Sequence, residues 1–470
     1  MSMEIKGKKV LVFGSGISGV AAGQLLLSEG AEVILYDGNV SLDRAMLRAE
    51  LLEGAEGLLS SPEEKEKLSG RARVILGDFP EEELDTLALV VISPGVPLDL
   101  PVVKRMHEMQ LPVWGEIELS YVYGQGDVLA ITGTNGKTTT TALLGEIMKN
   151  YKESVYVVGN IGNPYACVAS ETRPESVIVA EMSSFQLETI HTFCPVVSAV
   201  LNITPDHLNR HHTMEAYIEA KKNIFRNQTA EHTCVLNYED EVTRRFGENT
   251  NARVLYFSSR RKLERGICLD SGRIIYRDKE QVQICRTDEL QLLGVHNYEN
   301  VMAAAAMAIA YGVPMEIIRK TVKKFKGVEH RIEFVAETAG VAYYNDSKAT
   351  NPDAAIRGIQ AMNRPTLLIG GGYDKNSDYE DWIRAFHGKV KKLVLLGQTA
   401  EKIAAAAHRL GFEDTILVET FEEAVKTCVR FAMPGDAVLL SPACASWGMF
   451  KNYEERGDKF KELVQQLSTL

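Results

Sequence analysis

The chain lacks both a long apolar run and an ordered pattern of cysteines. Its first residues, MSMEIKGKKVLVFGSG, hold an apolar run too short for a signal peptide, and no segment approaches the roughly 18 apolar residues of a membrane span. The cysteines are odd in number, scattered and without a C-x-x-C pair: Cys167, Cys194, Cys234, Cys268, Cys285, Cys428 and Cys444. This argues against a disulfide framework and zinc ribbons. We therefore expect no membrane span and a reducing, cytoplasmic location.

Positive charge is also in deficit. The chain has 52 Lys and Arg against 63 Asp and Glu, which gives a formal net charge of -11. Proteins that bind nucleic acids concentrate Lys and Arg to displace counterions from phosphates, so we expect no nucleic-acid partner. The apolar fraction of 45% and the charged fraction of 24% are ordinary for globular proteins and predict packed cores.

Short apolar runs alternate with helical patterns along the whole chain. Eight runs are predicted to be buried strands: KKVLVFG, AEVILYD, LALVVISPG, DVLAITG, SVIVAE, PTLLIGGG, KKLVLLGQ and DAVLLSPA. This alternation predicts an α/β protein with parallel sheets covered by helices on both faces. A length of 470 residues suggests several domains. We place three, at residues 1–114, 115–327 and 328–470.

The first glycine-rich turn matches the dinucleotide-binding pattern. VLVFGSGISGV supplies Gly14, Gly16 and Gly19 after a strand, and Asp37 ends the next strand. Such glycines let a pyrophosphate approach the start of a helix. The pattern alone would indicate an NAD enzyme, although first turns of doubly wound sheets often carry glycine for structural reasons. We predict a nucleotide pyrophosphate here and leave its identity open.

A second glycine-rich turn, in VLAITGTNGKTTTT, resembles a phosphate-binding loop of unusual length. The usual spelling G-x-x-x-x-G-K-[ST] requires a glycine where this chain has Ile131. Gly133 and Gly136 still allow backbone N–H groups to face phosphate, Lys137 can reach the outer phosphates, and Thr138 can hold Mg²⁺. A helix N-cap of Thr and Asn would explain the threonines but not the order Gly, Lys, Thr.

Polar residues follow the next predicted strands. Glu181 ends a buried strand, where an acid can bind Mg²⁺ or orient a nucleophile, and LNITPDHLNRHH adds Asp206 and His207. A zinc site lacks a third well-spaced ligand. For His211 and His212 the alternative is that both simply face solvent. In MEAYIEAKKNIF, most lysines placed like Lys221 and Lys222 are solvated surface charges.

The C-terminal third holds further candidates. Arg331 offers a guanidinium fork for phosphate, and Lys348 lies in a loop after a strand. Asp346, Ser347, Thr350 and Asn351 are suited to turns or to capping the helix that starts at Pro352. In LLSPACASWGMF, Ser446 can bond a carboxylate, whereas Cys444 has no indicated His partner and is predicted to be a small buried thiol.

Together these motifs resemble the Mur ligases of bacterial peptidoglycan synthesis over essentially the whole chain. The matching segments, in the order of the family, are GTNGKTTT, GNIG, EMSSFQLE, LNITPDHLNRH, AYIEAK, GVHNYEN, HRIE, NDSKATNP and LSPACASWGMFKNYEERG. SSFQLE and DSKATN single out the branch that adds D-glutamate. The family spells its phosphate loop G-T-N-G-K-[ST], which accounts for the short spacing. Two departures stand out: HRIE where HRFE is usual, and Trp447 in the glutamate-side loop.

The resemblance implies a three-domain fold, with a Rossmann-like first domain that holds a UDP group without nicotinamide, a central P-loop ATPase-type domain and a C-terminal Rossmann-like domain that binds the amino acid. It assigns the UDP-linked substrate to Ile17, Ser18, Asp37, Ser93, Gly95 and Asn160. It assigns ATP to Gly133, Thr134, Asn135, Gly136, Lys137, Thr138, Thr139, Asn297, Asn300, Arg331 and Asp346, with Lys348 beside them. D-glutamate falls to Thr350, Lys375, Ser446 and Tyr453.

The resemblance also implies two Mg²⁺ ions, with Thr138, Glu181, His207 and Lys221 as metal-site residues. In the family, the lysine at the position of Lys221 is carbamylated by CO₂, which turns an ammonium into a carboxylate-like ligand. Lys137, Glu181, His207, Lys221 and Lys348 are the expected catalytic residues. Because a hard cation prefers oxygen, His207 is the less natural ligand.

The implied reaction joins D-glutamate to UDP-N-acetylmuramoyl-L-alanine through an acyl phosphate at the expense of ATP. We expect a monomer, and a third domain that closes on the central one. Three alternatives stay open: an NAD-dependent oxidoreductase, which leaves GTNGKT unused; a sister amide ligase such as a folylpolyglutamate synthase or another Mur ligase; and a non-catalytic nucleotide-binding regulator, which need not keep Lys221, Lys348 and Ser446 together.

Overall fold

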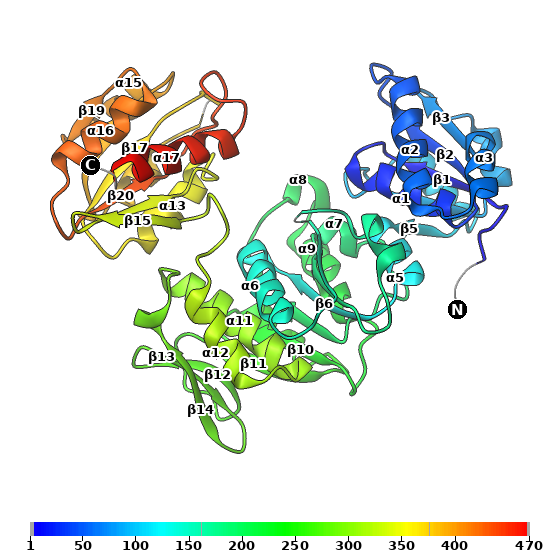
Figure 1. Cartoon of the computed structure of the whole chain (residues 1–470), viewed down its shortest axis with the longest axis horizontal. Coiled ribbons are helices and arrows are strands. Elements are labelled where there is room, and N and C mark those ends of the chain that lie inside the picture. The colour runs from blue at the N-terminus through cyan, green and yellow to red at the C-terminus, as the bar shows by residue number, and fades with distance from the viewer. Residues whose placement is uncertain (1–3, 161, 376, 468–470) are drawn as a thin grey trace. The chain divides into compact units, whose positions relative to one another are not determined.

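The computed structural model describes residues 4–160, 162–375 and 377–467. The chain divides into two compact units. The first comprises Met1–Asp270, Ile275–Val282 and Asn300–Ile318, and the second Ser271–Ile274, Gln283–Glu299 and Arg319–Leu470. Figure 1 shows three sheets, coloured blue, cyan to green, and yellow to red along the chain. Among the described residues, no helix is both long and apolar enough to cross a membrane.

The first sheet has the strand order β3-β2-β1-β4-β5, and every neighbouring pair is parallel. Its strands are β1 (Lys9–Phe13), β2 (Glu32–Asp37), β3 (Ala72–Leu76), β4 (Leu89–Ile92) and β5 (Val113–Gly115). The helices are α1 (Ile17–Ser28), α2 (Arg44–Leu58), α3 (Pro62–Arg71) and α4 (Pro101–Glu108). The order reverses at β1 and β4, which creates the kind of crevice where open α/β sheets bind ligands.

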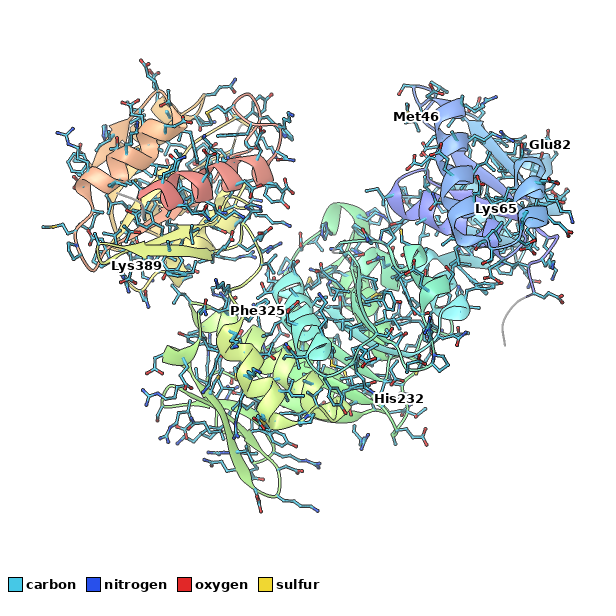
Figure 2. All side chains as sticks on the ribbon, in the orientation of Figure 1. Met46, Lys65, Glu82, His232, Phe325 and Lys389 are labelled. Atoms are coloured by element: carbon cyan, nitrogen blue, oxygen red, sulfur yellow. The ribbon has the colours of Figure 1, made fainter. Side chains whose placement is uncertain are left out.

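Helix α2 shows how the covering helices are placed. Met46, labelled in Figure 2, is 68% exposed on its outer face, whereas Leu51 and Ala55 on its inner face are fully buried. Its first turn is capped by Asp43, whose side chain accepts hydrogen bonds from the N–H groups of Ala45 and Met46. The helix therefore covers one face of the sheet with a narrow apolar stripe.

The second sheet has nine strands in the order β14-β13-β12-β11-β10-β9-β6-β8-β7. They are β6 (Asp127–Thr132), β7 (Val155–Gly159), β8 (Val177–Glu181), β9 (Val197–Val200), β10 (Thr233–Asn237), β11 (Arg253–Ser258), β12 (Gly266–Asp270), β13 (Arg273–Arg277) and β14 (Gln281–Arg286). The helices are α5 (Glu116–Tyr123), α6 (Lys137–Lys149), α7 (Ser184–Leu187), α8 (Leu208–His211), α9 (Met214–Lys222), α10 (Glu241–Phe246), α11 (Val295–Tyr311) and α12 (Met315–Lys324). Strand β6 lies between β8 and β9, parallel to both.

The third sheet has the order β15-β16-β20-β17-β18-β19. Its strands are β15 (Glu333–Thr338), β16 (Val341–Asn345), β17 (Thr366–Gly370), β18 (Val390–Leu395), β19 (Thr415–Leu417) and β20 (Ala437–Leu440). The helices are α13 (Pro352–Ala361), α14 (Glu380–Arg384), α15 (Ala400–Arg409), α16 (Phe421–Phe431) and α17 (Tyr453–Leu467). All neighbouring strands are parallel except β15 and β16, which are antiparallel.

The predicted α/β class is confirmed, and each of the eight predicted strands is present. The sequence did not predict the antiparallel β15 or the run β12 to β14. The reason is burial: β6, β8 and β20 are buried almost throughout and read as continuous apolar runs, whereas β13 and β14 carry charged or polar residues at exposed positions. Partly exposed strands such as β13 and β14 have no continuous apolar run, so they are hard to predict from the sequence without knowledge of the neighbouring strands.

Candidate active site

The second glycine-rich turn connects β6 to α6. Strand β6 ends at Thr132, and α6 begins at Lys137 after Gly136, whose φ of +86° is left-handed. A Cβ at Gly136 would lie 2.2 Å from Asn300 Oδ1, and Gly133 also has positive φ at +149°. Both glycines are therefore required by backbone geometry, and they leave the N–H groups at the start of α6 beside the turn.

Asn202 holds this turn from the end of the neighbouring strand β9. Its Oδ1 accepts from Asn135 N at 2.8 Å, its Nδ2 donates to Asn135 O at 3.0 Å, and its own carbonyl accepts from Thr134 N at 2.9 Å. The hydroxyls of Thr134 and Tyr217 lie 3.0 Å apart. Sequence analysis did not single out Asn202 or Tyr217; the available signal was a polar residue directly after a buried strand beside the loop.

Two lysines converge on one carbonyl of the turn. Lys137 Nζ donates to Gly133 O and to Thr134 O, both at 2.9 Å, and Lys221 Nζ donates to Gly133 O at 2.8 Å. Lys221 is only 2% exposed. Burial, and then the nearby Lys137 ammonium, lower the pKa of Lys221 to about 7. Lys221 is therefore poised between a cation and a neutral, nucleophilic amine.

The neighbouring Lys222 differs sharply from Lys221. Its Nζ forms a surface ion pair with Glu219 at 3.1 Å. The expectation that lysines in this segment are solvated surface charges is right for Lys222 and wrong for Lys221. The reason is helical periodicity: Lys221 follows the buried Tyr217 by four residues on α9, so both face inward.

Glu181 closes the other side of the turn. It ends β8, pairs in register with Ile131 of β6 and is 1% exposed. Its Oε1 accepts from Asn160 Nδ2 at 2.8 Å, while its Oε2 is buried and has no hydrogen-bond partner among the described residues. A buried carboxylate oxygen without a partner has the chemistry of a ligand for a hard cation. Within the described residues, no group of three or more His, Cys, Asp and Glu gathers around a common point.

The two histidines of LNRHH have opposite environments. His207 precedes α8 and has a φ of +52°. Its side chain is 52% exposed, and its Nε2 lies 3.5 Å from Asp206 Oδ2. His211 is buried, with Nε2 2.9 Å from Ser184 Oγ and Nδ1 3.3 Å from Glu188 Oε1. Burial, assisted by the Arg210 charge, lowers the pKa of His211 to about 4.

The solvent-facing alternative is therefore wrong for His211. This ring lies on the inner side of its short helix, at 5.3 Å from the ring of Phe185 and at the same distance from that of Tyr217. His212 is 68% exposed at its side chain and fits the alternative. The helix has only four residues, which is too few for its periodicity to predict which of the two histidines faces inward.

The first glycine-rich turn connects β1 to α1 and is tighter than the second. A Cβ at Gly19 would lie 1.8 Å from Gly14 O, and Ser93 Oγ donates to that carbonyl at 3.0 Å. Asp37 Oδ2 accepts from Ser15 N at 2.9 Å and from Ser15 Oγ at 2.8 Å. Burial opposes ionisation of Asp37, but the hydrogen bonds from Ser15 and Asn39 hold its pKa below the ordinary value.

Other residues predicted to bind the UDP-linked substrate lie around this turn. Ile17, the first residue of α1, is 79% exposed. Ser18 is half-buried and Gly95 is exposed. Asn160 lies instead at the end of β7, beside Glu181.

The third sheet gathers a second group of predicted residues at the ends of β16 and β20. Asp346 is 6% exposed and accepts from Ser441 Oγ at 2.7 Å; burial raises its pKa to about 7. Lys348 Nζ lies 5.2 Å from the ring centroid of Tyr453. Arg331 is exposed. Asn351 caps α13 by accepting from Ala354 N at 2.9 Å, as expected for this segment.

Arg456, which sequence analysis did not select, ties the two loops together. It is 1% exposed and donates to Ser347 Oγ at 2.9 Å, to Ser347 O at 2.7 Å and to Cys444 O at 3.1 Å. Only the fold reveals this role, because an arginine on a terminal helix is usually a surface charge. Cys444 is a buried thiol, as predicted, and burial raises its pKa.

The remaining predicted residues have distinct surroundings. Asn300 Oδ1 accepts from Thr140 Oγ1 at 3.4 Å, next to the second turn, and Asn297 Nδ2 donates to Leu293 O at 2.8 Å. Ser446 is buried, Thr350 is half-buried and Lys375 is exposed. Thr138 and Thr139 occupy the first turn of α6.

Comparison with protein-family models gives two matches. Residues 131–308 match the Mur ligase middle domain, and residues 330–444 match the Mur ligase, glutamate ligase domain. Together these segments cover more than half of the chain.

Curated relatives match over almost the full length. The chain is 57% identical to UDP-N-acetylmuramoylalanine--D-glutamate ligase of Lachnoclostridium phytofermentans, covering 99% of both chains. It is 46% identical to the protein of that name from Clostridioides difficile, covering 99% of this chain and 100% of the relative.

Solved structures share the fold at low identity. UDP-N-acetylmuramate-alanine ligase MurC of Thermotoga maritima aligns with a TM-score of 0.57 at 18% identity, covering 98% of this chain and 99% of that one. A pseudomurein peptide ligase type C from Methanothermus fervidus aligns with a TM-score of 0.54 at 17% identity, covering 98% of this chain and 100% of that one. These likenesses support the three-domain α/β architecture.

Proposed function

The chain belongs to the Mur ligase family, and from that premise we propose that it is an ATP-dependent ligase that joins D-glutamate to UDP-N-acetylmuramoyl-L-alanine in peptidoglycan precursor synthesis. The observation that carries the proposal is the 57% identity over 99% of both chains to a ligase named for these substrates. The convergence of Lys137 and Lys221 on Gly133 O gives the chain the charged centre that such a reaction needs.

We assign the UDP-linked substrate to residues 1–114, with Asn160 contributing from the central part. The exposed Ile17 at the start of α1 and the open turn around Gly95 support this assignment, because they leave apolar surface and backbone available to a nucleotide. The NAD-dependent alternative has less support, since the curated relatives named above are ligases.

We assign ATP to the second turn in residues 115–327 and to Arg331, Asp346 and Lys348 in residues 328–470. Lys137 now donates to two backbone carbonyls, and the same ammonium can exchange these acceptors for phosphate oxygens. The last segment is also assigned D-glutamate, through Thr350, Lys375, Ser446 and Tyr453. A cytoplasmic location follows from the use of ATP and a nucleotide-linked substrate.

The donor set around the turn fits magnesium. Glu181 Oε2 is buried without a hydrogen-bond partner in the described part of the chain, and Thr138 stands at the start of α6, so both offer oxygen to a hard cation. Bound Mg²⁺ would supply neutralisation of phosphate charge. We propose that Lys221 is carbamylated, because its pKa of about 7 keeps a large share of the amine neutral and able to add CO₂. We also assign His207 to the metal site; its ring centroid lies 5.1 Å from that of Phe185.

The chemistry then divides into two displacements. An oxygen of the substrate carboxylate bonds to the γ-phosphorus of ATP as the bond to ADP breaks, which gives an acyl phosphate. The amine of D-glutamate bonds to the acyl carbon and loses a proton, and the phosphate leaves. Both steps gather negative charge, so Lys137 and Lys348 act by electrostatic stabilisation and by holding the phosphates in place.

The test is phosphate release from ATP in the presence of Mg²⁺ and UDP-N-acetylmuramoyl-L-alanine, across a panel of amino acids. Release with D-glutamate, and not with L-alanine, L-glutamate, L-lysine or meso-diaminopimelate, is the expected result. Release with a different amino acid would retain the ligase and replace the substrate. No release with any member of the panel would reject the proposed function.

A further inference from the structure

Two loops of the third sheet are joined side by side beyond the ends of their strands. Strands β17 and β20 are parallel neighbours, so the loops that follow them leave the sheet at the same edge. Tyr373 N donates to Ala445 O at 3.0 Å, and the two residues form an antiparallel bridge. A Cβ at Gly372 would lie 2.4 Å from Ala445 O, so glycine is needed for this close approach.

An aromatic pair stands on this junction. The rings of Tyr373 and Trp447 have centroids 5.6 Å apart at an interplanar angle of 62°. Both remain in contact with solvent, with Trp447 53% exposed and Tyr373 37% exposed. An indole left this open gains little from burial, so its contribution to folding does not explain it.

A lysine ammonium lies over the face of the indole. Lys375 Nζ is 4.6 Å from the ring centroid of Trp447, within the distance at which a cation is attracted by the electrons of an aromatic face. The adjacent acid, Asp374, is occupied by Lys402, whose Nζ lies 3.1 Å from Asp374 Oδ2. The charge beside Lys375 is therefore largely neutralised, and its ammonium keeps its attraction for an external anion.

We propose that Trp447, braced by Tyr373, is a positioning residue that holds Lys375 ready for a carboxylate of the incoming amino acid. A lysine is a flexible chain that loses rotamer freedom when it is fixed by a ligand. Holding its ammonium over the indole beforehand removes part of that loss and so favours binding. The inference rests on the proposed function, because it takes Lys375 as part of the glutamate site. It adds a residue that fixes this lysine before the amino acid binds.

The experiment measures D-glutamate-dependent phosphate release by the full chain. Trp447→Leu is expected to raise the KM for D-glutamate by about fivefold and to change kcat much less, since a cation–π contact contributes to binding by roughly this order. Trp447→Phe, with a weaker aromatic face, is expected to have a KM between those of the wild type and Trp447→Leu. The matched control is Phe431→Leu, which removes another exposed ring beneath a lysine, with Lys392 Nζ at 4.9 Å.

Fluorinated tryptophans placed at position 447 alone separate electrostatics from shape. Each added fluorine withdraws charge from the ring face while leaving its size nearly unchanged, so the KM is expected to rise stepwise with fluorine number. In a Lys375→Ala background the same series is expected to be flat.

The outcomes separate the two proposals. A wild-type chain that releases no phosphate with D-glutamate would reject the proposed function itself. If the wild-type chain releases phosphate with D-glutamate but fluorination of Trp447 leaves the KM unchanged, this inference alone is overturned. That holds even if Trp447→Leu raises the KM, since the loss of the ring's shape could cause that rise. An equal rise in KM for Phe431→Leu would also overturn it.

Discussion

The two glycine-rich turns of this chain have the same strand-to-helix backbone arrangement, but the side chains around them differ. Each follows a buried parallel strand and opens a helix: Gly14 to Gly19 between β1 and α1, and Gly133 to Gly136 between β6 and α6. The first is closed by Ser93 and Asp37, which contact it through an uncharged hydroxyl and an acid. The second is surrounded by two lysines and by Asn202.

The difference shows that the side chains of the surrounding helices, strands and loops, rather than the glycines, give each turn its chemistry. In the first turn Asp37 is satisfied by Ser15, so its charge is used to hold the loop. In the second, Lys221 donates to Thr132 Oγ1 and to Gly133 O, and its burial, with the nearby Lys137 charge, lowers its pKa to about 7. This contrast fits the proposal that the first turn only binds a nucleotide, whereas the second takes part in phosphate chemistry.

The largest expected effect is at Lys221. If the chemistry belongs to the second turn, Lys221→Ala lowers phosphate release with D-glutamate by about a thousandfold, a loss typical of removing a central electrostatic group. Short carboxylates such as formate or acetate are expected to restore part of the rate by replacing the carbamate. Lys222→Ala, one residue away and ion-paired at the surface, is the control and should change the rate less than about twofold. Equal losses in both variants would contradict the assignment.

Gly19→Ala tests the tightness of the first turn. Because the new Cβ would lie 1.8 Å from Gly14 O, we expect a loss of about 3 kcal/mol in the free energy of unfolding. Gly57→Ala in α2 has nothing within 4 Å and is expected to stabilise by roughly 0.5–1 kcal/mol. Denaturant unfolding measures both, and equal stability of the two variants would show that the turn is more adaptable than its geometry indicates.

Substitutions of Asn202 test whether the second turn depends on the hydrogen bonds from this side chain. Asn202→Ala leaves Asn135 N and O without their partner, at a cost of about 1–3 kcal/mol, and we expect the KM for ATP to rise roughly tenfold. Asn202→Asp keeps the acceptor and loses the donor, so it should be intermediate. Affinity for the UDP-linked substrate should stay unchanged in both, and a parallel loss there would mean that the two turns are coupled.

The smallest expected effect is on pH dependence at the first turn. Since the folded pKa of Asp37 is lowered by Ser15 and Asn39, its contribution to stability is fully present above the ordinary value of 3.8 and is lost as pH falls through the lower folded pKa. Asp37→Asn should therefore be less stable than wild type near neutral pH, and the gap should narrow in acid. Thermal unfolding between neutral and strongly acidic pH measures the gap, and a constant gap would contradict the assignment.

Much of the local structure was accessible from the sequence. Strands such as DVLAITG and DAVLLSPA were predicted because burial on both faces makes them continuously apolar. The glycines of both turns were identified from their spacing, and the resemblance to the family named the residues around them. By contrast, the structural roles of Asn202, Tyr217 and Arg456 were not predicted, because their hydrogen-bond partners lie 67, 83 and 109 residues away along the chain.

The alternation of strands and helices and the positions of the two turns could be read from the sequence, since they depend on local composition and spacing, and the family was indicated by the resemblance of its motifs. The burial of Lys221, the surface ion pair of Lys222, the inward orientation of His211 and the contact of Lys375 with Trp447 became clear from the folded chain alone. The physical reason is that burial, pKa and aromatic contact depend on groups brought together by strand order, and separation along the chain does not record that order.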